Sequence, residues 1–129
     1  MNELKFYECS QCGNIIEIIH PSGIKVECCN ETMKKLYAKT EDEGKEKHIP
    51  VLKVFGNNLE VTIGDIPHPM EKEHYINWIV LKTDKGVQRK CLNPGDLPRV
   101  IFRLADDEKV EAVYSYCNIH GLWVKCMNS

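Results

Sequence analysis

The sequence predicts a mainly β protein, in which a small metal-bound N-terminal domain is followed by a seven-stranded, immunoglobulin-like antiparallel β-sandwich. Three observations support this fold class. Cysteines gather in two close pairs near the N-terminus, as they do in domains held together by a metal ion. From residue 48 onward short apolar alternations recur between turn residues, without a helical period. Four histidines and one cysteine of this second region fall in loop or turn contexts.

The overall composition is that of an ordinary globular protein. The 129 residues are 43% hydrophobic and 28% charged, enough for one ordinary domain or a small domain plus a tiny one. A net charge of −2 provides no basic field for nucleic acid or an anionic membrane. No run approaches the ~20 apolar residues of a membrane helix, and the N-terminus lacks an apolar signal core. We therefore expect a cytoplasmic protein with no nucleic-acid partner and no membrane association.

The cysteines predict a first metal site. Seven cysteines in a reducing compartment favour metal ligation over disulfides. Cys9 and Cys12 form a Cys-x2-Cys knuckle followed by Gly13, and Cys28 and Cys29 are directly adjacent. Four thiols in two pairs match a tetrahedral site, for which zinc and iron are both suitable. Because Cys28 and Cys29 are neighbours in the chain, we expect distorted angles at the metal.

Residues 1–38 form the predicted first domain. The β-branched and apolar stretch 14–20 predicts a strand, and residues 25–27 predict a second one. His20 adjoins a turn, and we expect it to be a surface residue rather than a ligand. A unit of this size is too small to be stable on its core alone. The metal is therefore expected to supply the missing stability.

The rest of the chain predicts the sandwich. Residues 39–47 are polar, charged and aperiodic, which predicts a linker, so we assign the sandwich to residues 48–129. Seven apolar stretches separated by turn residues predict seven strands. They cover residues 51–55, 59–63, 75–81, 87–92, 99–104, 110–114 and 122–125. A sandwich of this kind brings distant residues together in its end loops.

A second metal site is predicted in those loops. Cys117 and His120 are three positions apart in the last turn, which Gly121 closes, and two prolines stiffen the loop around His68. The five candidate ligands are His48, His68, His74, Cys117 and His120.

Four other sulfur-containing residues are expected to be structural. Cys91 and Cys126 fall in predicted strands, and we expect both to be small buried hydrophobic residues. Met70 and Met127 are expected to be packing residues rather than ligands.

Two kinds of metal centre fit the second site. A type 1 copper protein also combines a Greek-key sandwich with a late loop carrying a cysteine, a histidine and a weak methionine, which Cys117, His120 and Met127 imitate. Copper of that type takes two histidines, whereas this region offers four. The other candidate is five-coordinate iron, with four imidazoles in a plane, one axial thiolate and an open position opposite the sulfur.

The motifs of the chain resemble those of a known family. They are Cys9-x2-Cys12, Cys28-Cys29, 46–51 (EKHIPV), 66–70 (IPHPM), 74–78 (HYINW), 93–96 (NPGD) and 116–123 (YCNIHGLW). In order and spacing they resemble desulfoferrodoxin, the two-iron class of superoxide reductase, over nearly the whole chain. The resemblance implies a desulforedoxin/rubredoxin-like Fe(Cys)4 domain and a catalytic Fe(His)4Cys site, with two iron ions per chain.

The resemblance also implies a function. It implies one-electron reduction of superoxide to hydrogen peroxide at the non-haem Fe(His)4Cys centre, without dioxygen release. Glu46 would occupy the open position in the ferric resting state, and Lys47 would approach the substrate. The family implies a rubredoxin-type electron donor and a homodimer. The alternative is an electron-transfer metalloprotein without turnover, either type 1 copper-like or a zinc-ribbon-plus-sandwich binding module.

Overall fold

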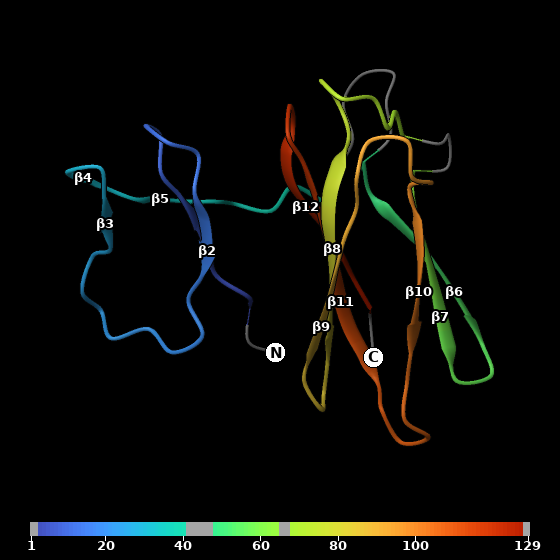
Figure 1. Ribbon diagram of the computed structural model, residues 1–129. Coiled ribbons are helices and arrows are strands. Elements are labelled where there is room, and N and C mark those ends of the chain that lie inside the picture. Colours follow the sequence, from blue (N-terminus) through green and yellow to red (C-terminus); the bar gives the residue numbers. More distant parts are fainter. Residues whose placement is uncertain (1–2, 41–47, 65–67, 128–129) are drawn as a thin grey trace. The chain divides into compact units, whose positions relative to one another are not determined.

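The computed structural model describes residues 3–40, 48–64 and 68–127. Within these ranges every regular element is a β-strand (Figure 1), and no helix there is long and apolar enough to cross a membrane. The chain divides into two compact units, Met1–Tyr37 and Ala38–Ser129. The predicted fold class is confirmed.

The first unit is built from very short strands. They are β1 (Phe6–Glu8), β2 (Ile15–Glu17), β3 (Glu27–Cys28), β4 (Glu31–Thr32) and β5 (Lys34–Lys35). One antiparallel sheet has the order β2-β1-β5, and β3 and β4 form a separate hairpin. Strands of two or three residues are too short to show a period in sequence. This explains why β1, β4 and β5 were not predicted.

The second unit is a two-sheet sandwich with the seven predicted strands. They are β6 (Pro50–Phe55), β7 (Asn58–Ile63), β8 (Ile76–Thr83), β9 (Val87–Cys91), β10 (Arg99–Arg103), β11 (Val110–Cys117) and β12 (Gly121–Cys126). One sheet has the order β10-β7-β6 and the other β12-β11-β8-β9, and all pairings are antiparallel. Both sheets contain strands distant in sequence, as in immunoglobulin-like folds.

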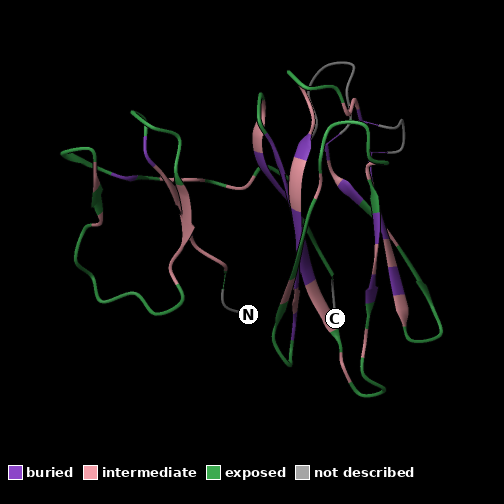
Figure 2. Cartoon of the chain, in the orientation of Figure 1, coloured by how far each residue is buried: buried purple, intermediate pink, exposed green. Residues whose placement is uncertain are grey.

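The core lies between the two sheets. It consists of Leu59, Val61, Ile63, Ile76, Ile79, Leu81, Val100, Phe102, Val113 and Cys117. Strand β7 alternates strictly between buried and half-buried positions, as a strand with one covered face should. Strand β11 is buried along most of its length (Figure 2), because it pairs with a strand on each side. Cys117 therefore belongs both to the core and to the candidate site.

The expectation for the two remaining cysteines was wrong. Cys91 and Cys126 lie in strands, but both are exposed. β9 and β12 are the outer strands of their sheet, so their end residues are not covered by the core. Met127 is also 41% exposed, whereas Met70 packs against the core as expected. His20 is exposed, in agreement with the prediction.

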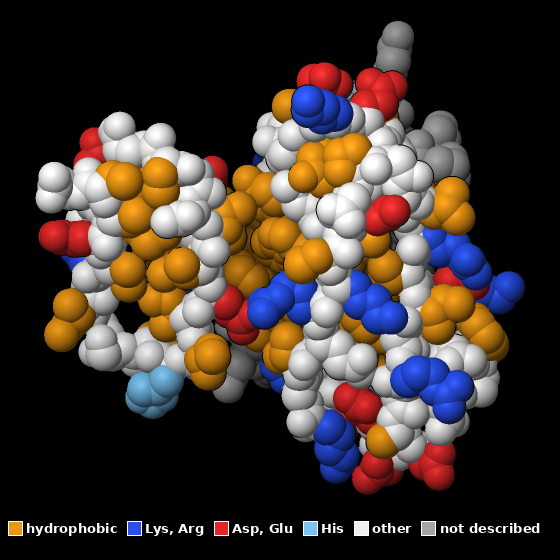
Figure 3. Space-filling view, in the orientation of Figure 1, with side chains coloured by type: hydrophobic (Ala, Val, Ile, Leu, Met, Phe, Trp, Pro, Cys, Tyr) orange, Lys and Arg blue, Asp and Glu red, His pale blue; other side chains and the backbone are white. Residues whose placement is uncertain are grey.

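Lys and Arg are interspersed with Asp and Glu on the face of the sandwich shown in Figure 3. The division of the chain at residues 38 and 47 stays a prediction, because most of the expected linker lies outside the described residues.

Candidate metal centres

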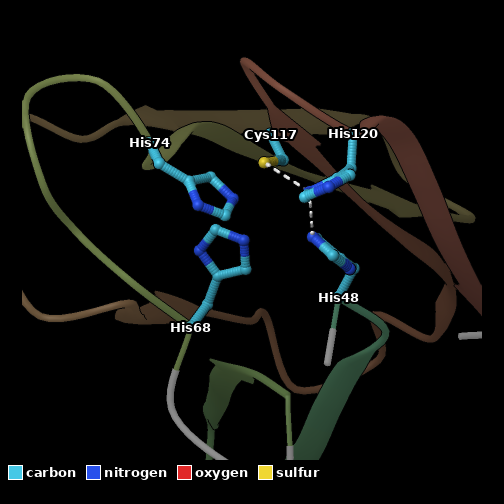
Figure 4. A group of neighbouring side chains, drawn as sticks. All are labelled: His48, His68, His74, Cys117 and His120. Atoms are coloured by element: carbon cyan, nitrogen blue, oxygen red, sulfur yellow. Dashed lines mark hydrogen bonds between the residues drawn. The ribbon is translucent and has the colours of Figure 1, made fainter. Parts of the chain in front are cut away.

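Five side chains of the second unit converge at one end of the sandwich (Figure 4). The four imidazoles form a closed ring in the order His48, His68, His74 and His120. Neighbouring ring centroids are 4.7, 4.8, 5.0 and 4.7 Å apart around this ring. The fifth side chain is the fully buried Cys117. The ligand atoms of all five residues lie within 4.8 Å of one another.

The distances suit a single metal ion. The Nε2 of His48 lies 3.1 Å from the Nδ1 of His120. Two nitrogens that bind one ion at right angles, each at about 2.1 Å, are separated by about 3 Å. The Sγ of Cys117 lies 3.8 Å from the same Nδ1. Imidazole and thiolate are ligands that suit first-row transition metals.

His48 is held in place by two residues of the opposite sheet. It directly precedes β6 and is 2% exposed. Its carbonyl accepts a hydrogen bond from the Ser115 hydroxyl at 3.2 Å. Its ring stacks on the Trp123 indole, with centroids 4.5 Å apart and an interplanar angle of 9°. The first ligand is thus fixed by β11 and β12.

His68 and His74 are oriented by backbone groups in the connection from β7 to β8. The Nδ1 of His68 lies 2.7 Å from the Pro69 carbonyl oxygen. A carbonyl can only accept, so Nδ1 is the donor and carries the ring proton, which leaves Nε2 to bind a metal. His74 is fixed by a tight turn, in which its N–H and carbonyl both pair with the backbone of Glu71.

Asn118 ties the two ligand-bearing segments together. Its Oδ1 accepts from the Tyr75 N–H at 3.0 Å and its Nδ2 donates to the Glu73 carbonyl at 3.0 Å. Its own N–H donates to the Tyr75 carbonyl at 3.3 Å. The turn that carries Cys117 and His120 closes at Gly121, whose φ of 84° is easily adopted only by glycine.

One buried polar atom indicates that a metal belongs here. The Nε2 of His74 is buried, and the described residues offer it no hydrogen-bond partner. A metal ion would satisfy this nitrogen, which otherwise bears the cost of an unmet hydrogen bond. The ring of imidazoles therefore fits a bound metal.

A type 1 copper centre does not fit the same geometry. Four imidazoles converge on the site instead of two. Met127 follows the far end of β12, six residues beyond Gly121. At about 3.3 Å per residue, that places it on the order of 20 Å along the strand from the turn.

The first unit gathers the other predicted ligands. Cys9, Cys12, Cys28 and Cys29 bring their sulfurs within 4.8 Å of one another. The Sγ of Cys28 lies 3.7 Å from that of Cys12 and 4.0 Å from that of Cys29. A tetrahedral ion with bonds of about 2.3 Å separates its sulfurs by about 3.8 Å. The spacing fits a four-thiolate metal site.

The adjacent cysteines both reach the site through an unusual backbone. Cys29 and Asn30 have φ of 54° and 61°, in the left-handed region that most L residues avoid. This conformation turns the chain sharply between β3 and β4. The backbone at Cys29 and Asn30 therefore adapts its conformation so that both neighbouring cysteines can reach the site.

Side chains around the knuckle link its two halves. Glu31 accepts hydrogen bonds from the Ser10 hydroxyl and the Gln11 amide, each at 2.9 Å. These two donors are the residues between Cys9 and Cys12. The Asn14 amide lies 3.7 Å from the Cys28 sulfur and can donate to it.

The thiols differ in acidity. The backbone N–H of Cys12, together with that of Gln11, lowers the pKa of Cys9 to about 7 by stabilising its thiolate. The opposite occurs at Cys29, where the nearby sulfurs of Cys12, Cys9 and Cys28 raise the pKa to about 12. Contact with Cys9 and then Cys12 likewise raises the pKa of Cys28. A bound cation relieves this crowding of negative charge.

All nine predicted ligands are therefore brought together in two groups. Glu46 and Lys47 lie outside the described residues. Asn118, Ser115 and Trp123, which support the second group, were not identified from the sequence. The only signal for two of them in the sequence was their position, since Asn118 follows Cys117 and Trp123 lies three residues after His120.

Comparison with known proteins shows which family shares these features. The model of the desulfoferrodoxin family matches residues 40–126, and that of the desulfoferrodoxin N-terminal domain matches residues 1–36. A desulfoferrodoxin homolog from Archaeoglobus fulgidus is 48% identical, with 93% of this chain and 94% of the relative covered.

Solved structures agree in fold. The crystal structure of the superoxide reductase from Treponema pallidum has a TM-score of 0.83 and 38% identity, covering 95% of this chain and 98% of that one. A one-iron superoxide reductase from Giardia intestinalis has a TM-score of 0.57 and 34% identity, covering 66% of this chain and 100% of that one.

The fold and the two ligand groups define a two-centre metalloprotein with a cysteine-ligated unit and a histidine-rich sandwich. With both family models matched across most of the chain, the protein belongs to the desulfoferrodoxin family. The resemblance found in the sequence is confirmed.

Proposed function

We propose that the protein is a superoxide reductase. It adds one electron and two protons to superoxide, forms hydrogen peroxide and releases no dioxygen. The ring of four imidazoles beside the buried Cys117 carries this proposal. Family membership and the likeness to solved superoxide reductases support it.

Each chain carries two iron ions, one in each ligand group. Bound ferrous iron at the second centre supplies the single electron that superoxide needs. Cys117 contributes a thiolate that is screened from water by the core. Four neutral imidazoles add no charge, so the five ligands together contribute a single negative charge. The centre keeps a net positive charge, which attracts a small anion.

Glu46 and Lys47 are proposed as the pair of residues that acts on the substrate at this centre. They immediately precede His48, so the chain itself keeps both within two residues of a ligand. The Lys47 ammonium would attract superoxide, and the Glu46 carboxylate would occupy the substrate position when no substrate is bound.

A rubredoxin-type protein is proposed as the electron donor, and a homodimer as the assembly. A cytoplasmic location is proposed as well, because the family resemblance implies it. Both the donor and the assembly rest on the family resemblance.

The function is tested by metal analysis and product counting. Freshly purified protein should contain two irons per chain. The ferrous form should consume superoxide and form one hydrogen peroxide per superoxide. An oxygen electrode should detect no release of dioxygen. Dioxygen release would indicate dismutation instead. A colourless zinc protein without turnover would favour the binding-module alternative.

Lys47 provides a sharper test of the substrate's charge. After screening by water and salt, an ammonium near the site contributes about 1 kcal/mol to the attraction of the anion. Lys47→Ala should therefore slow the reaction of the ferrous protein with superoxide several-fold, up to about tenfold, and weaken its dependence on ionic strength. Lys47→Arg should keep most of the rate. Pulse radiolysis across a salt series measures both.

Lys45→Ala is the matched control, because it removes the same charge two residues earlier in the chain, further in sequence from His48. An unchanged rate and salt slope in Lys47→Ala, or an equal effect of Lys45→Ala, would remove Lys47 from the mechanism.

A further inference from the structure

Lys39 pairs with the outer edge of the sheet that carries the second centre. Its N–H donates to the Leu122 carbonyl at 2.9 Å, and its carbonyl accepts from the Val124 N–H at 3.0 Å. These bonds form a parallel bridge between Lys39 and Trp123. β12 is an edge strand, and such a strand leaves backbone groups open to pairing. The backbone of Lys39 is thus anchored next to the Cys117–His120 turn.

The side chain of Lys39 extends toward His120 and Trp123. Its Nζ donates a hydrogen bond to the His120 carbonyl at 3.0 Å. The same ammonium lies 5.0 Å from the centroid of the Trp123 ring, within the range of a cation–π interaction. Trp123 is 3% exposed and stacks on His48. The Lys39 ammonium therefore contacts the backbone of one candidate ligand, His120. It also contacts the tryptophan that stacks on a second candidate ligand, His48.

Residues 39–47 were predicted to be a charged linker, and an ordinary lysine in such a linker would be fully solvated. Two observations distinguish Lys39 from that case. Its backbone makes two hydrogen bonds to β12, which fix the origin of the side chain. Its ammonium makes two contacts, one with the His120 carbonyl in the turn and one with the Trp123 ring in β12. The backbone hydrogen bonds and the ammonium contacts together restrict the positive charge of Lys39 to one place beside the four histidines.

We propose that Lys39 is a positioning residue of the second centre, which holds the His120 turn and Trp123 and places a fixed positive charge beside His48 and His120. This inference rests on the proposed iron site. A nearby positive charge opposes the more highly charged ferric state, so it favours the ferrous form. The hydrogen bond to the His120 carbonyl also holds the turn that carries Cys117 and His120, which should slow the loss of the metal.

Three substitutions separate charge from packing. Lys39→Met keeps the aliphatic stem and removes both the charge and the donor. Lys39→Gln keeps a donor without charge, and Lys39→Arg keeps both. Lys125→Met is the matched control, because Lys125 is an exposed lysine on the same strand β12.

Two measurements on the iron-loaded protein test the inference. Spectroelectrochemistry gives the midpoint potential of the second centre, and a ferrous chelator gives the rate of iron loss. In Lys39→Met we expect the potential to fall and iron loss to accelerate about two- to fivefold, the scale of one exposed cation–π or hydrogen-bond contact. Lys39→Gln should show the lower potential with a smaller change in iron loss. Lys39→Arg should restore both.

Unchanged potential and iron loss in Lys39→Met would overturn the inference, as would an equal effect of Lys125→Met. Neither measurement requires superoxide. Failure of the proposed function would instead be seen in the parent protein, as absent turnover or a missing second iron.

Discussion

At the scale of single residues, the second centre depends on side chains that bind no metal. Asn118 uses its amide and its own N–H to join the turn of Cys117 and His120 to the segment before β8. It thereby sets the distance between ligands that are more than forty positions apart in the chain. Groups that orient metal ligands in this way commonly affect affinity about ten- to a hundredfold.

Replacing Asn118 tests this support. Asn118→Ala removes two side-chain hydrogen bonds, each worth about 1 kcal/mol, without changing a ligand. We expect iron loss from the second centre to accelerate about tenfold, while the first centre keeps its iron. Chelator-release kinetics, followed at the absorption of each centre, measure the two rates.

Asn57→Ala is the matched control for this change. Asn57 also makes a side-chain hydrogen bond, to Asp106 at 2.6 Å, but it lies in the turn between β6 and β7. Equal effects of the two substitutions would show that Asn118 contributes only to general stability.

The two groups of cysteine and histidine side chains that converge could be predicted from the sequence, and the residues that support them could not. Cysteine and histidine at short spacing have few common explanations besides metal binding. Asparagine and tryptophan have many roles, and the partners of Asn118 lie 43 and 45 positions away. The cyclic order of the four imidazoles was also inaccessible, because it depends on how the strands pair.

At the scale of elements, the end of the sandwich away from the metal is held by one hydroxyl and one carboxylate. Thr83, at the end of β8, is fully buried and donates to Glu108 at 2.6 Å. Its oxygen also accepts from the N–H groups of Lys85 and Gly86 at 3.1 Å each. Glu108 accepts in addition from the Ala105 N–H at 3.0 Å. These contacts join the loop after β8 to the loop before β11.

This network predicts a pH-dependent stability. The hydrogen bond from Thr83, followed by that from Ala105, lowers the pKa of Glu108 from its ordinary value of 4.5. A carboxylate with a lowered folded-state pKa stabilises the protein above its unfolded pKa, and this contribution is lost as the pH falls through the folded-state pKa. Glu108→Gln should therefore lower the thermal midpoint at pH 7, and the difference from the parent should shrink below pH 4.5.

Thermal unfolding of parent and variant between pH 7 and pH 3 measures that difference, in which any shared effect of acid on the metal centres cancels. Glu73→Gln is the control, because Glu73 is exposed and its contact with Asn118 is made by its backbone carbonyl rather than by its carboxylate. A difference that stays constant across the pH range would contradict the assignment to the Glu108 carboxylate.

Strand prediction succeeded in the sandwich for a physical reason. Its strands are five to eight residues long, enough for period-two alternation to be visible. In the first unit the strands are shorter, and the sulfur group decides where the chain turns. The positive φ at Cys29 and Asn30 had no signal in the residue types, since glycine would be the usual choice there.

At the scale of the whole molecule, the two ligand groups share no residue and lie in different units. We therefore predict that the centres are separable. Cys12→Ser should remove iron from the first centre, and the second should keep its iron and its reaction with superoxide. Iron content and the optical bands of each centre provide the measurement.

The reciprocal change, His74→Ala, should damage only the second centre. Loss of both irons from Cys12→Ser alone would show that the two units depend on each other.

The position of the ligands along the chain also has a consequence for biosynthesis. All four sulfurs of the first centre are present once residue 29 has been made, whereas the imidazole ring needs His48 and His120 together. A ribosome adds about 5–20 residues per second, so the cysteine group exists for several seconds before the last histidine is added. Iron can enter the first centre during translation. The second centre can receive its iron only after nearly the whole sandwich has been synthesised and its first and last strands have met.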